Sequence, residues 1–314
     1  MSEISKIFLD STPKKKIERR IIKYLKNNKI KAVIDKCGNV TAKISGIGRP
    51  LLLCARLDAE SPRAGVVAIL SATSILQRKK IQHRPLELVF TKEDGGAANL
   101  NMNNFKSKEC LVLDCCRPLG HIIITSPYIY SIKIKVLGRA THAGSEPEKG
   151  ISAIQIVAKA ISELKLGRVS KSTTNNLGII NAGSAINIIP AEARIIGEAR
   201  SLEKEKALEQ VDLINKAFKK NTRRFKGKFF FRAKLVCSGY NHYTQDPFIK
   251  KIAATNKKLN LKTVYEKSGG ASDANTLIKK RIKAVNISYG GNGAHTIKVS
   301  DLKKLSEFIV EFAR

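Results

Sequence analysis

The pattern of apolar positions predicts alternating strands and helices at both ends of the chain. Continuous apolar runs at residues 51–55, 86–90 and 110–113 are typical of strands buried on both faces of a sheet. Residues 64–76 are apolar nearly all round, which predicts a buried helix. Apolar residues at helical spacing in residues 17–25 predict an amphipathic helix. Strands that alternate with helices indicate an α/β domain with a mostly parallel sheet.

The middle of the chain follows a different pattern. Residues 128–137 alternate, with isoleucine and valine on one side and lysine on the other, as in a half-buried strand. The order strand, helix, strand, strand, helix, strand then follows, which is the ferredoxin-like unit. The later elements are expected at residues 151–164, 177–180, 193–199, 202–218 and 229–236.

The α/β pattern returns after Pro247, where helices and a strand are again expected. A domain inserted into another domain accounts for this change and return. We therefore predict a discontinuous α/β domain of residues 1–126 and 238–314, split around an inserted ferredoxin-like lid at residues 127–237.

The most informative motif follows the first lid strand. It reads Gly138-Arg139-Ala140-Thr141-His142-Ala143-Gly144 and continues through Glu146-Pro147-Glu148-Lys149-Gly150-Ile151. It resembles the signature of the dimerisation (lid) domain in the M20 family of zinc metallopeptidases, especially the peptidase T-like members. The resemblance implies an M20-type catalytic domain, two zinc ions that activate a water, a glutamate general base and a homodimer formed through the lid. The implied reaction is hydrolysis of short peptides or N-acyl amino acids.

The first metal motif of that family, a His-x-Asp at the end of a buried strand, is altered in this chain. Asp58 is in place, but Arg56 stands where the resemblance requires the ligand histidine. A guanidinium keeps its proton and has no lone pair for zinc. The aspartate that bridges the two metals in the family aligns with Pro62, which has no side-chain ligand. Two expected ligands are therefore replaced.

The next family motif is a Glu-Glu pair, in which the first residue is the general base and the second binds metal. This chain has Glu93-Asp94-Gly95 at the corresponding place. If the alignment with the family has no gap here, Asp94 takes the general-base position and Gly95 the ligand position. If the alignment has a gap of one residue, Glu93 and Asp94 take these two positions. Asp58, Glu93 and Asp94 are thus the candidate catalytic residues that remain.

Two metal ligands are preserved, Asp114 and His295, and the resemblance assigns them to different metals. A catalytic zinc normally has three protein ligands, so we expect zinc to be absent or weakly bound. Carboxylates that gather at a strand end need a counter-charge. Arg56 projects from the same strand end, and we predict that it pairs with Asp114 or Asp58 in place of zinc.

The residues that the resemblance places at the substrate are better preserved. His142 resembles the family histidine that helps to hold the substrate carbonyl, usually across the dimer. Asn187 and Arg200 match positions that bind the terminal carboxylate of the peptide. Gly269 and Gly270 belong to a Gly-Gly-x-Ser-Asp segment near the cleft. Each also has a structural interpretation, such as a turn glycine or an aspartate that caps a helix.

The charge of the chain is extreme, with 58 Lys and Arg against 26 Asp and Glu and a net charge of +32. Such a balance attracts polyanions. The basic residues are spread along the whole chain, however, and we favour a solvated basic surface over a dedicated nucleic-acid site. Residues 226–231, Lys-Gly-Lys-Phe-Phe-Phe, superficially resemble an RNA-binding strand, but the spacing does not fit. We expect the three phenylalanines to fill both faces of a packed strand.

The six cysteines show no Cys-x-x-Cys spacing, and reduced thiols in a cytoplasmic protein are expected. We expect no signal peptide at the N-terminus and no membrane-spanning helix. The chain shows no nucleophile elbow and no phosphate-binding loop, so no rival catalytic motif competes with the resemblance.

Three hypotheses about function remain. The favoured one is an inactive or strongly impaired M20 relative that keeps a peptide-binding cleft or a dimer surface. The second is an active hydrolase with a rebuilt metal site that recruits some of Cys115, Cys116, Glu60, Glu93 or Asp94. The third is a basic polyanion-binding protein on the same scaffold.

Overall fold

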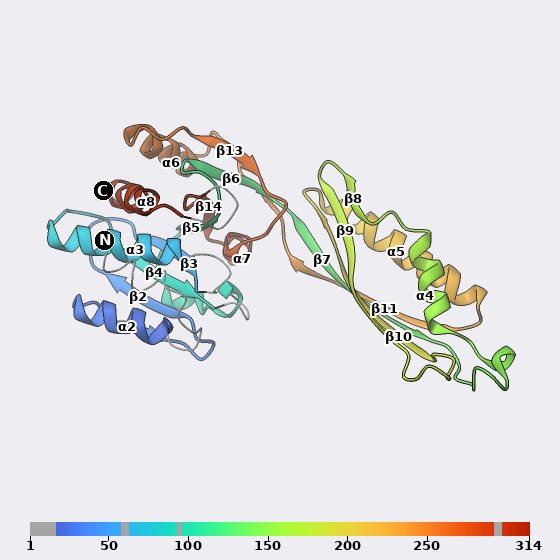
Figure 1. Ribbon diagram of the computed structural model, residues 1–314. Helices are drawn as coiled ribbons and strands as arrows, with labels where there is room; N and C mark the ends of the chain where they lie inside the picture. The colour runs from blue at the N-terminus through green and yellow to red at the C-terminus, as the bar shows by residue number, and fades with distance from the viewer. Residues whose placement is uncertain (1–16, 58–62, 93–95, 292–296) are drawn as a thin grey trace. The chain divides into compact units, whose positions relative to one another are not determined.

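The computed structural model describes residues 17–57, 63–92, 96–291 and 297–314 (Figure 1). The chain divides into two compact units. The α/β unit consists of residues 1–125 and 241–314, and the lid unit of residues 126–240. The lid unit is a single insertion between two halves of the α/β unit, which therefore folds from segments far apart in the sequence.

The described residues of the α/β unit build a nine-stranded sheet in the order β1-β2-β4-β3-β5-β14-β6-β12, with β13 paired to β6. Its strands are β1 (Ala32–Ile34), β2 (Val40–Ile44), β3 (Leu51–Arg56), β4 (Leu86–Thr91), β5 (Glu109–Cys115), β6 (His121–Ser126), β12 (Tyr240–Asn241), β13 (Val264–Lys267) and β14 (Lys283–Ser288). The central neighbours β4, β3, β5 and β14 all run parallel. The carboxyl ends of these strands therefore meet at one edge of the sheet, as the apolar runs predicted.

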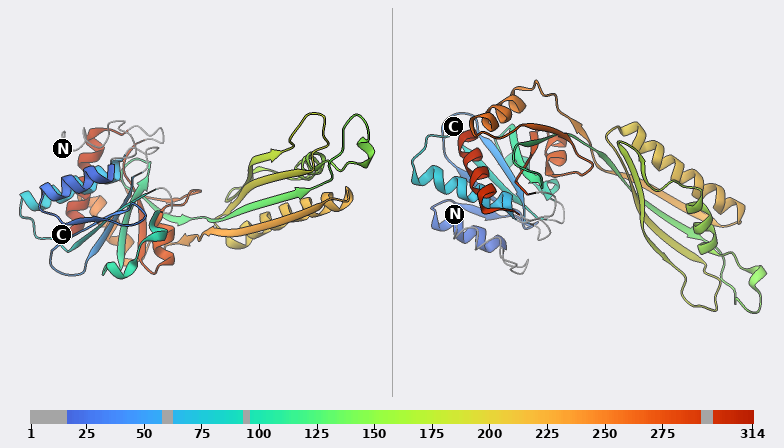
Figure 2. Two further views of the ribbon diagram at one scale, coloured as in Figure 1. Left: turned by 90° about the horizontal axis from the view of Figure 1, so that it is seen from below. Right: turned by 45° about the horizontal axis from the view of Figure 1, so that its top comes forward.

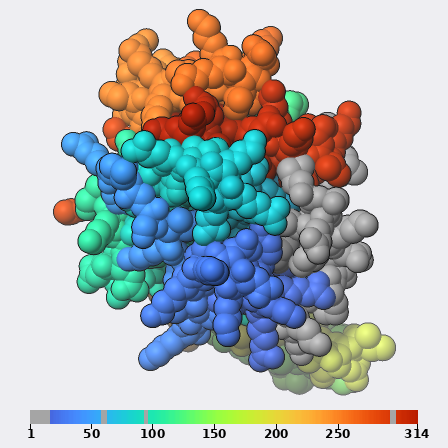
Figure 3. Space-filling view, turned by 90° about the vertical axis from the view of Figure 1, so that its left-hand side faces the viewer, coloured from blue at the N-terminus to red at the C-terminus, as the bar shows by residue number. Residues whose placement is uncertain are grey.

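Helices cover both faces of this sheet. The helices α2 (Ile17–Asn27), α3 (Ala64–Arg78), α6 (Pro247–Lys258) and α8 (Val299–Ala313) share one apolar core with the side chains of Leu51, Leu53 and Ala55. Figure 3 shows α3 between α2 and α8 on this side of the unit. The shorter α7 (Asp273–Lys279) and η2 (Gly96–Asn99) contact each other and lie toward the alternate residues of the strands, such as Cys54. No helix among the described residues is long and apolar enough to cross a bilayer.

The start of α3 packs unusually close to the strands. A Cβ atom on Gly65 would lie 2.7 Å from the carbonyl oxygen of Leu113 and 2.9 Å from its Cβ. Only glycine permits this approach at the second position of the helix. The close contact holds the amino end of α3 against the ends of β3 and β5, where the site described below lies.

The lid unit is an antiparallel sheet in the order β11-β7-β10-β9-β8. Its strands are β7 (Tyr128–Leu137), β8 (Gly167–Ser170), β9 (Thr173–Ala182), β10 (Glu192–Ser201) and β11 (Lys228–Cys237). Helices α4 (Ala153–Ser162) and α5 (Lys204–Arg224) lie on one face of it and leave the other face open (Figures 1 and 2). The central strand β7 pairs with both β10 and β11, which confirms the predicted ferredoxin-like order.

Two details of the lid differ from the sequence prediction. The strand expected at residues 177–180 begins at Thr173, and the short strand β8 was not predicted at all. The residues that the prediction left out of this strand are polar. Thr173 is nevertheless buried, and its hydroxyl lies 2.9 Å from the Ser201 hydroxyl in a hydrogen bond. The Asn175 amide is likewise buried and donates to Gln210 at 2.9 Å. Polar residues that find partners inside a fold carry no hydrophobic signal in the sequence.

Candidate functional site

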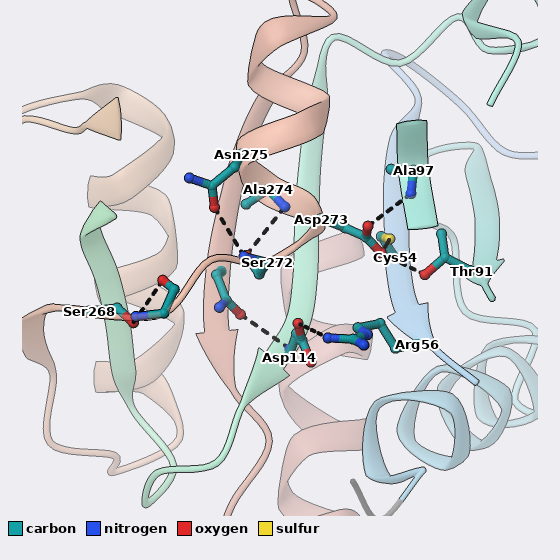
Figure 4. A network of polar contacts seen from close by, with 12 residues as sticks. Cys54, Arg56, Thr91, Ala97, Asp114, Ser268, Ser272, Asp273, Ala274 and Asn275 are labelled. Atoms are coloured by element: carbon teal, nitrogen blue, oxygen red, sulfur yellow. Dashed lines mark hydrogen bonds and ion pairs between the residues drawn. The ribbon is translucent and has the colours of Figure 1, made fainter. Parts of the chain in front are cut away.

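Polar side chains gather at the carboxyl edge of the parallel strands (Figure 4). Arg56 ends β3, Thr91 ends β4, and Asp114 is the second-last residue of β5. All three extend from the sheet face opposite the main core, since Ala55, Phe90 and Leu113, which directly precede them, belong to that core. In open α/β sheets this edge is where ligands bind.

Arg56 and Asp114 form an ion pair across neighbouring strands. Nη1 of Arg56 lies 3.8 Å from Oδ2 of Asp114, and their side chains are 36% and 11% exposed. The backbone N–H of Asp114 donates to Oδ1 of Asn286 on β14 at 3.2 Å, which ties the aspartate to the next strand. The predicted pairing of Arg56 with Asp114 is confirmed, whereas the other predicted partner, Asp58, lies outside the described residues.

A second guanidinium lies at the same strand end. Arg63 is only 7% exposed, and its Nε donates to the carbonyl oxygen of Leu57 at 3.4 Å. Leu57 directly follows Arg56, so both cations belong to the end of β3. Arg63 is not among the site residues that the sequence predicts, because its burial depends on the close approach of α3.

Asp273, at the start of α7, is a buried carboxylate that accepts three hydrogen bonds from other elements. It is 8% exposed. It accepts hydrogen bonds from the Thr91 hydroxyl at 2.5 Å, the backbone N–H of Ala97 at 2.8 Å and the Cys54 thiol at 3.7 Å. The interpretation of this aspartate as a helix cap is wrong, because Ser272 caps α7 instead. Asp273 joins α7 to β3, β4 and η2 at the edge that carries Arg56.

The surroundings of three cysteines near the site favour the protonated thiol. Burial raises the pKa of the Cys115 thiol to about 12, with Glu266 adding to the effect. Burial, followed by the charge of Asp273, likewise raises the pKa values of Cys54 and Cys110 well above the ordinary value. Metals bind the thiolate form, which these surroundings disfavour. Cys116, the other cysteine considered for a rebuilt site, is partly buried and free.

The described residues by themselves do not form a complete metal site. No group of three His, Cys, Asp or Glu side chains among them is placed to hold a metal. Asp114 is paired with a guanidinium where a metal ligand was expected. The other residues considered for the metal and catalytic site, Asp58, Glu60, Pro62, Glu93, Asp94 and His295, lie outside the described residues.

The lid unit brings His142 and Asn187 side by side. The segments that carry them pair through the Ala143 N–H and the Asn187 carbonyl at 2.9 Å, and through a bridge between His142 and Ile188. His142 is exposed, and its Nδ1 accepts the backbone N–H of Gly144 at 3.1 Å. A neutral imidazole with an accepting Nδ1 carries its proton on Nε2. His142 therefore presents a hydrogen-bond donor to solvent.

Arg200 lies far from that pair within one chain. It is near the end of β10, whereas Asn187 precedes the start of the strand at Glu192. Eight strand residues span about 26 Å at 3.3 Å per residue. Arg200 is held by Glu198 through two bonds, Nε to Oε1 at 2.7 Å and Nη2 to Oε2 at 2.8 Å. The structure thus unites His142 and Asn187 but separates them from Arg200.

Gly269 and Gly270 lie in the exposed loop that joins β13 to α7. The Ser268 hydroxyl accepts the N–H of Gly270 at 3.0 Å and donates to the carbonyl oxygen of Gly270 at 3.1 Å. Ser272 and Asn275 then form a capping box that starts α7. The loop therefore leads directly to Asp273 at the carboxyl edge of the sheet (Figure 4).

Comparison with known proteins agrees with this architecture. Residues 126–226, most of the lid unit, match the family model M20_dimer, the peptidase dimerisation domain. The chain is 32% identical over 256 residues to the uncharacterized protein YqjE of Bacillus subtilis, an alignment that covers 79% of this chain and 69% of that protein.

Solved structures share the whole fold. Aminopeptidase PepT of Bacillus cereus superposes with a TM-score of 0.85 at 24% identity, over 99% of this chain and 96% of that one. YxeP of Bacillus subtilis, a dinuclear metal binding peptidase, superposes with a TM-score of 0.76 at 15% identity, over 99% and 96% of the two chains. The lid model and the relative that aligns with most of both chains lead to one conclusion: this chain belongs to the M20 family of peptidases.

Proposed function

We propose that this chain is an M20-family protein whose hydrolytic site is lost or strongly impaired and which still binds a short peptide or an N-acyl amino acid. The observation that carries the proposal is the ion pair between Arg56 and Asp114. Zinc is the expected cofactor of the family, and we propose that it is absent or weakly bound in this chain.

The physical reason is one of charge. A carboxylate that is only 11% exposed needs a nearby cation, and the Arg56 guanidinium supplies one in the place of a metal. A zinc ion bound by Asp114 would have to displace this guanidinium or share the carboxylate with it. Either arrangement opposes metal binding, because like charges repel strongly at a site with little solvent.

The binding part of the proposal rests on the lid unit. His142 and Asn187 offer an imidazole N–H donor and an amide at one end of the sheet, and Arg200 offers a guanidinium near the other end. One chain does not unite the three, so a complete peptide site needs a second copy. We therefore propose a homodimer formed through the lid, as the matching dimerisation-domain model suggests.

A cytoplasmic location is part of the same proposal. All six cysteines are free, and two of them, Cys54 and Cys110, are fully buried. Free thiols in this number suit a reducing compartment.

Metal analysis of the purified protein, combined with a hydrolysis screen, tests the proposal. The screen would use tripeptides and N-acyl amino acids, each with and without added zinc, manganese or cobalt. We expect less than one equivalent of bound metal in total and no metal-dependent turnover. Two tightly bound metals per chain with turnover that a chelator abolishes would favour the second hypothesis, a rebuilt metal site.

Two engineered variants sharpen this test. Arg56→His restores the family's ligand at one position but leaves Pro62 in place of the bridging carboxylate. Arg56→His combined with Pro62→Asp restores both. We expect the single variant to remain inactive and the double variant to gain metal affinity over it. Turnover by the unaltered chain that Arg56→His reduces would contradict the proposal.

A further inference from the structure

The lid sheet has one open face, and its composition is unlike that of the covered face. Phe229, Phe231 and Leu235 of β11 pack against the core beneath α4 and α5. Strand residues alternate between the two faces, so Phe230, Arg232 and Lys234 lie on the open side. The expectation that the three phenylalanines fill a packed strand is wrong for Phe230, which is 60% exposed.

Strand register aligns these residues with others across the sheet. Phe230 pairs with Lys135 of β7, which in turn pairs with Arg194 of β10. Arg232 pairs with Lys133 in the same way, and Lys133 pairs with Ile196. Both rows continue onto β9, where Arg194 pairs with Asn181 and Ile196 pairs with Ile179. The open face is therefore a continuous platform formed by four adjacent strands, β11, β7, β10 and β9.

The charge on this platform is strongly positive. By register, its basic side chains are Lys133, Lys135, Arg194, Arg200, Lys228, Arg232 and Lys234, and its acidic ones are Glu192 and Glu198. Both acids are already neutralised, Glu192 by Lys135 and Arg194, and Glu198 by Arg200. Lys133, Arg232 and Lys234 are exposed. In the lid unit, all of which the structure describes, none of these three makes an ion pair.

We propose that the open face of the lid sheet binds single-stranded nucleic acid without sequence preference. Sites of this kind combine cations that follow the phosphates with an exposed aromatic ring on which a base stacks. Lys133, Arg232 and Lys234 supply the cations, and Phe230 supplies the ring in the adjoining row. The proposal goes beyond the proposed peptide binding and does not depend on the metal site.

A single strand fits this face better than other polyanions do. A duplex is read by an element that enters a groove, whereas this face is a sheet whose helices lie on the opposite side. A purely electrostatic partner, such as an acidic peptide or an anionic membrane, would make no particular use of the exposed Phe230. The aromatic ring therefore separates the proposal from general attraction to the charge of +32.

The helix face of the same unit provides a matched control. Lys219 and Arg223 of α5 are exposed and lie on the covered side of the sheet, and within the lid unit neither makes an ion pair. The variant Arg232→Glu with Lys234→Glu changes the charge of the open face by the same amount as Lys219→Glu with Arg223→Glu changes that of the helix face. The two variants differ only in which side of the lid they alter.

The experiment measures binding of a fluorescently labelled 12-nucleotide oligouridylate to the full-length protein by anisotropy, between 50 and 200 mM salt. We expect the open-face double variant to lose about 10-fold or more in affinity, and its salt slope to fall by about two. Phe230→Ala should lose about 5-fold or more with an unchanged slope, because stacking involves no counterion. The α5 variant should lose less than about 3-fold.

Any one of four outcomes would overturn the proposal, provided that thermal melts show all variants to be folded. Equal losses in the open-face and α5 variants would indicate general electrostatics. Unchanged affinity in Phe230→Ala would indicate a polyanion surface without base stacking. Absence of binding at 50 mM salt, or tighter binding of polyglutamate or anionic vesicles than of the oligonucleotide, would reject the assignment directly.

Discussion

Arg56 on β3 and Asp114 on β5 face each other across adjacent parallel strands, with Nη1 3.8 Å from Oδ2. The guanidinium is about one third exposed, whereas the carboxylate is 11% exposed. Asp114 thus has more need of a partner than Arg56 does. The residue that replaces the expected histidine ligand, Arg56, thus contacts the preserved aspartate ligand, Asp114.

Replacement of Arg56 by alanine should destabilise the fold. It leaves Asp114 without its cation in a mostly buried position, and we expect a loss of about 1–3 kcal/mol, between the values for exposed and for buried pairs. Urea unfolding measures the change. Arg78→Ala, at an exposed arginine of α3, is the control and should stay within about 0.5 kcal/mol of the parent.

A double-mutant cycle with Asp114→Asn isolates the pair itself. Arg56→Ala should cost less in the Asp114→Asn background than in the parent, because the stranded charge is then gone. Strictly additive losses would mean that the two side chains do not interact, and the proposed replacement of the metal by Arg56 would lose its support.

Asp273 should contribute more to stability than any other carboxylate near the site. Asp273→Ala leaves the Thr91 hydroxyl and the Ala97 N–H without their acceptor in a buried region, at a cost of about 2–4 kcal/mol. Asp301→Ala, near the start of α8 at a partly exposed position, is a control of the same chemical change. Equal thermal melting temperatures for the two variants would contradict the role assigned to Asp273.

The sequence predicted the strands whose residues follow a simple pattern of buried and exposed positions. Apolar runs located β3, β4 and β5, and alternation located β7, because each signal lies within a few consecutive residues. The segment that contains Asp273 was recognised, but its bond to Thr91 was not, since the two residues are 182 positions apart. Arg63 escaped recognition for a related reason: its burial follows from the approach of α3 that Gly65 permits. Arg56 could be predicted because a motif fixed both its position and the charge around it.

The proposed dimer should form through the outer edge of β9. In the lid unit, which is described throughout, β8 covers β9 only as far as Asn175 and leaves residues 176–182 as an open edge. Ile179 and Ile180 on this edge are 50% and 48% exposed, and Ile154 of the nearby α4 is 48% exposed. An unpaired, apolar strand edge is suited to pairing with a second copy.

Ile180→Asp should therefore give monomers at micromolar concentration in light scattering, because it places a charge at the pairing edge. Val236→Asp introduces the same charge on the opposite edge strand, β11, at a residue that is 57% exposed, and should leave the dimer intact. A monomeric parent protein would reject the dimer. A dimer that only Val236→Asp disrupts would move the interface to the other edge of the sheet.

His242 should make the stability of the α/β unit depend on pH below neutrality. Burial lowers its pKa from the ordinary value of 6.5, with the charge of Lys283 acting in the same direction. The hydrogen bond to the Ala284 carbonyl and the charge of Asp246 oppose this but do not outweigh it. The ring is partly buried, and its Nε2 lies 2.8 Å from the Ala284 oxygen on β14.

The sign of the effect follows from the lowered pKa. Between the folded pKa and 6.5 the unfolded chain binds a proton that the folded chain does not, so the free energy of unfolding falls as the pH drops through this window. Above pH 6.5 both states are neutral at this residue, and its contribution is constant. His242→Asn removes the titrating group and leaves an amide that can still donate a hydrogen bond.

Urea unfolding at pH 5.5 and pH 7.5 measures the difference. We expect the parent to lose more stability between these two values than His242→Asn does, with the two proteins changing in parallel above pH 7. His83→Asn is the control, since His83 lies in the loop just before β4, away from His242 on the sheet, and among the described residues its ring forms a hydrogen bond with the carbonyl oxygen of its neighbour Arg84 through Nδ1. This variant should keep the pH dependence that His242 causes. An identical loss in the parent and in His242→Asn would show that His242 is not the titrating group.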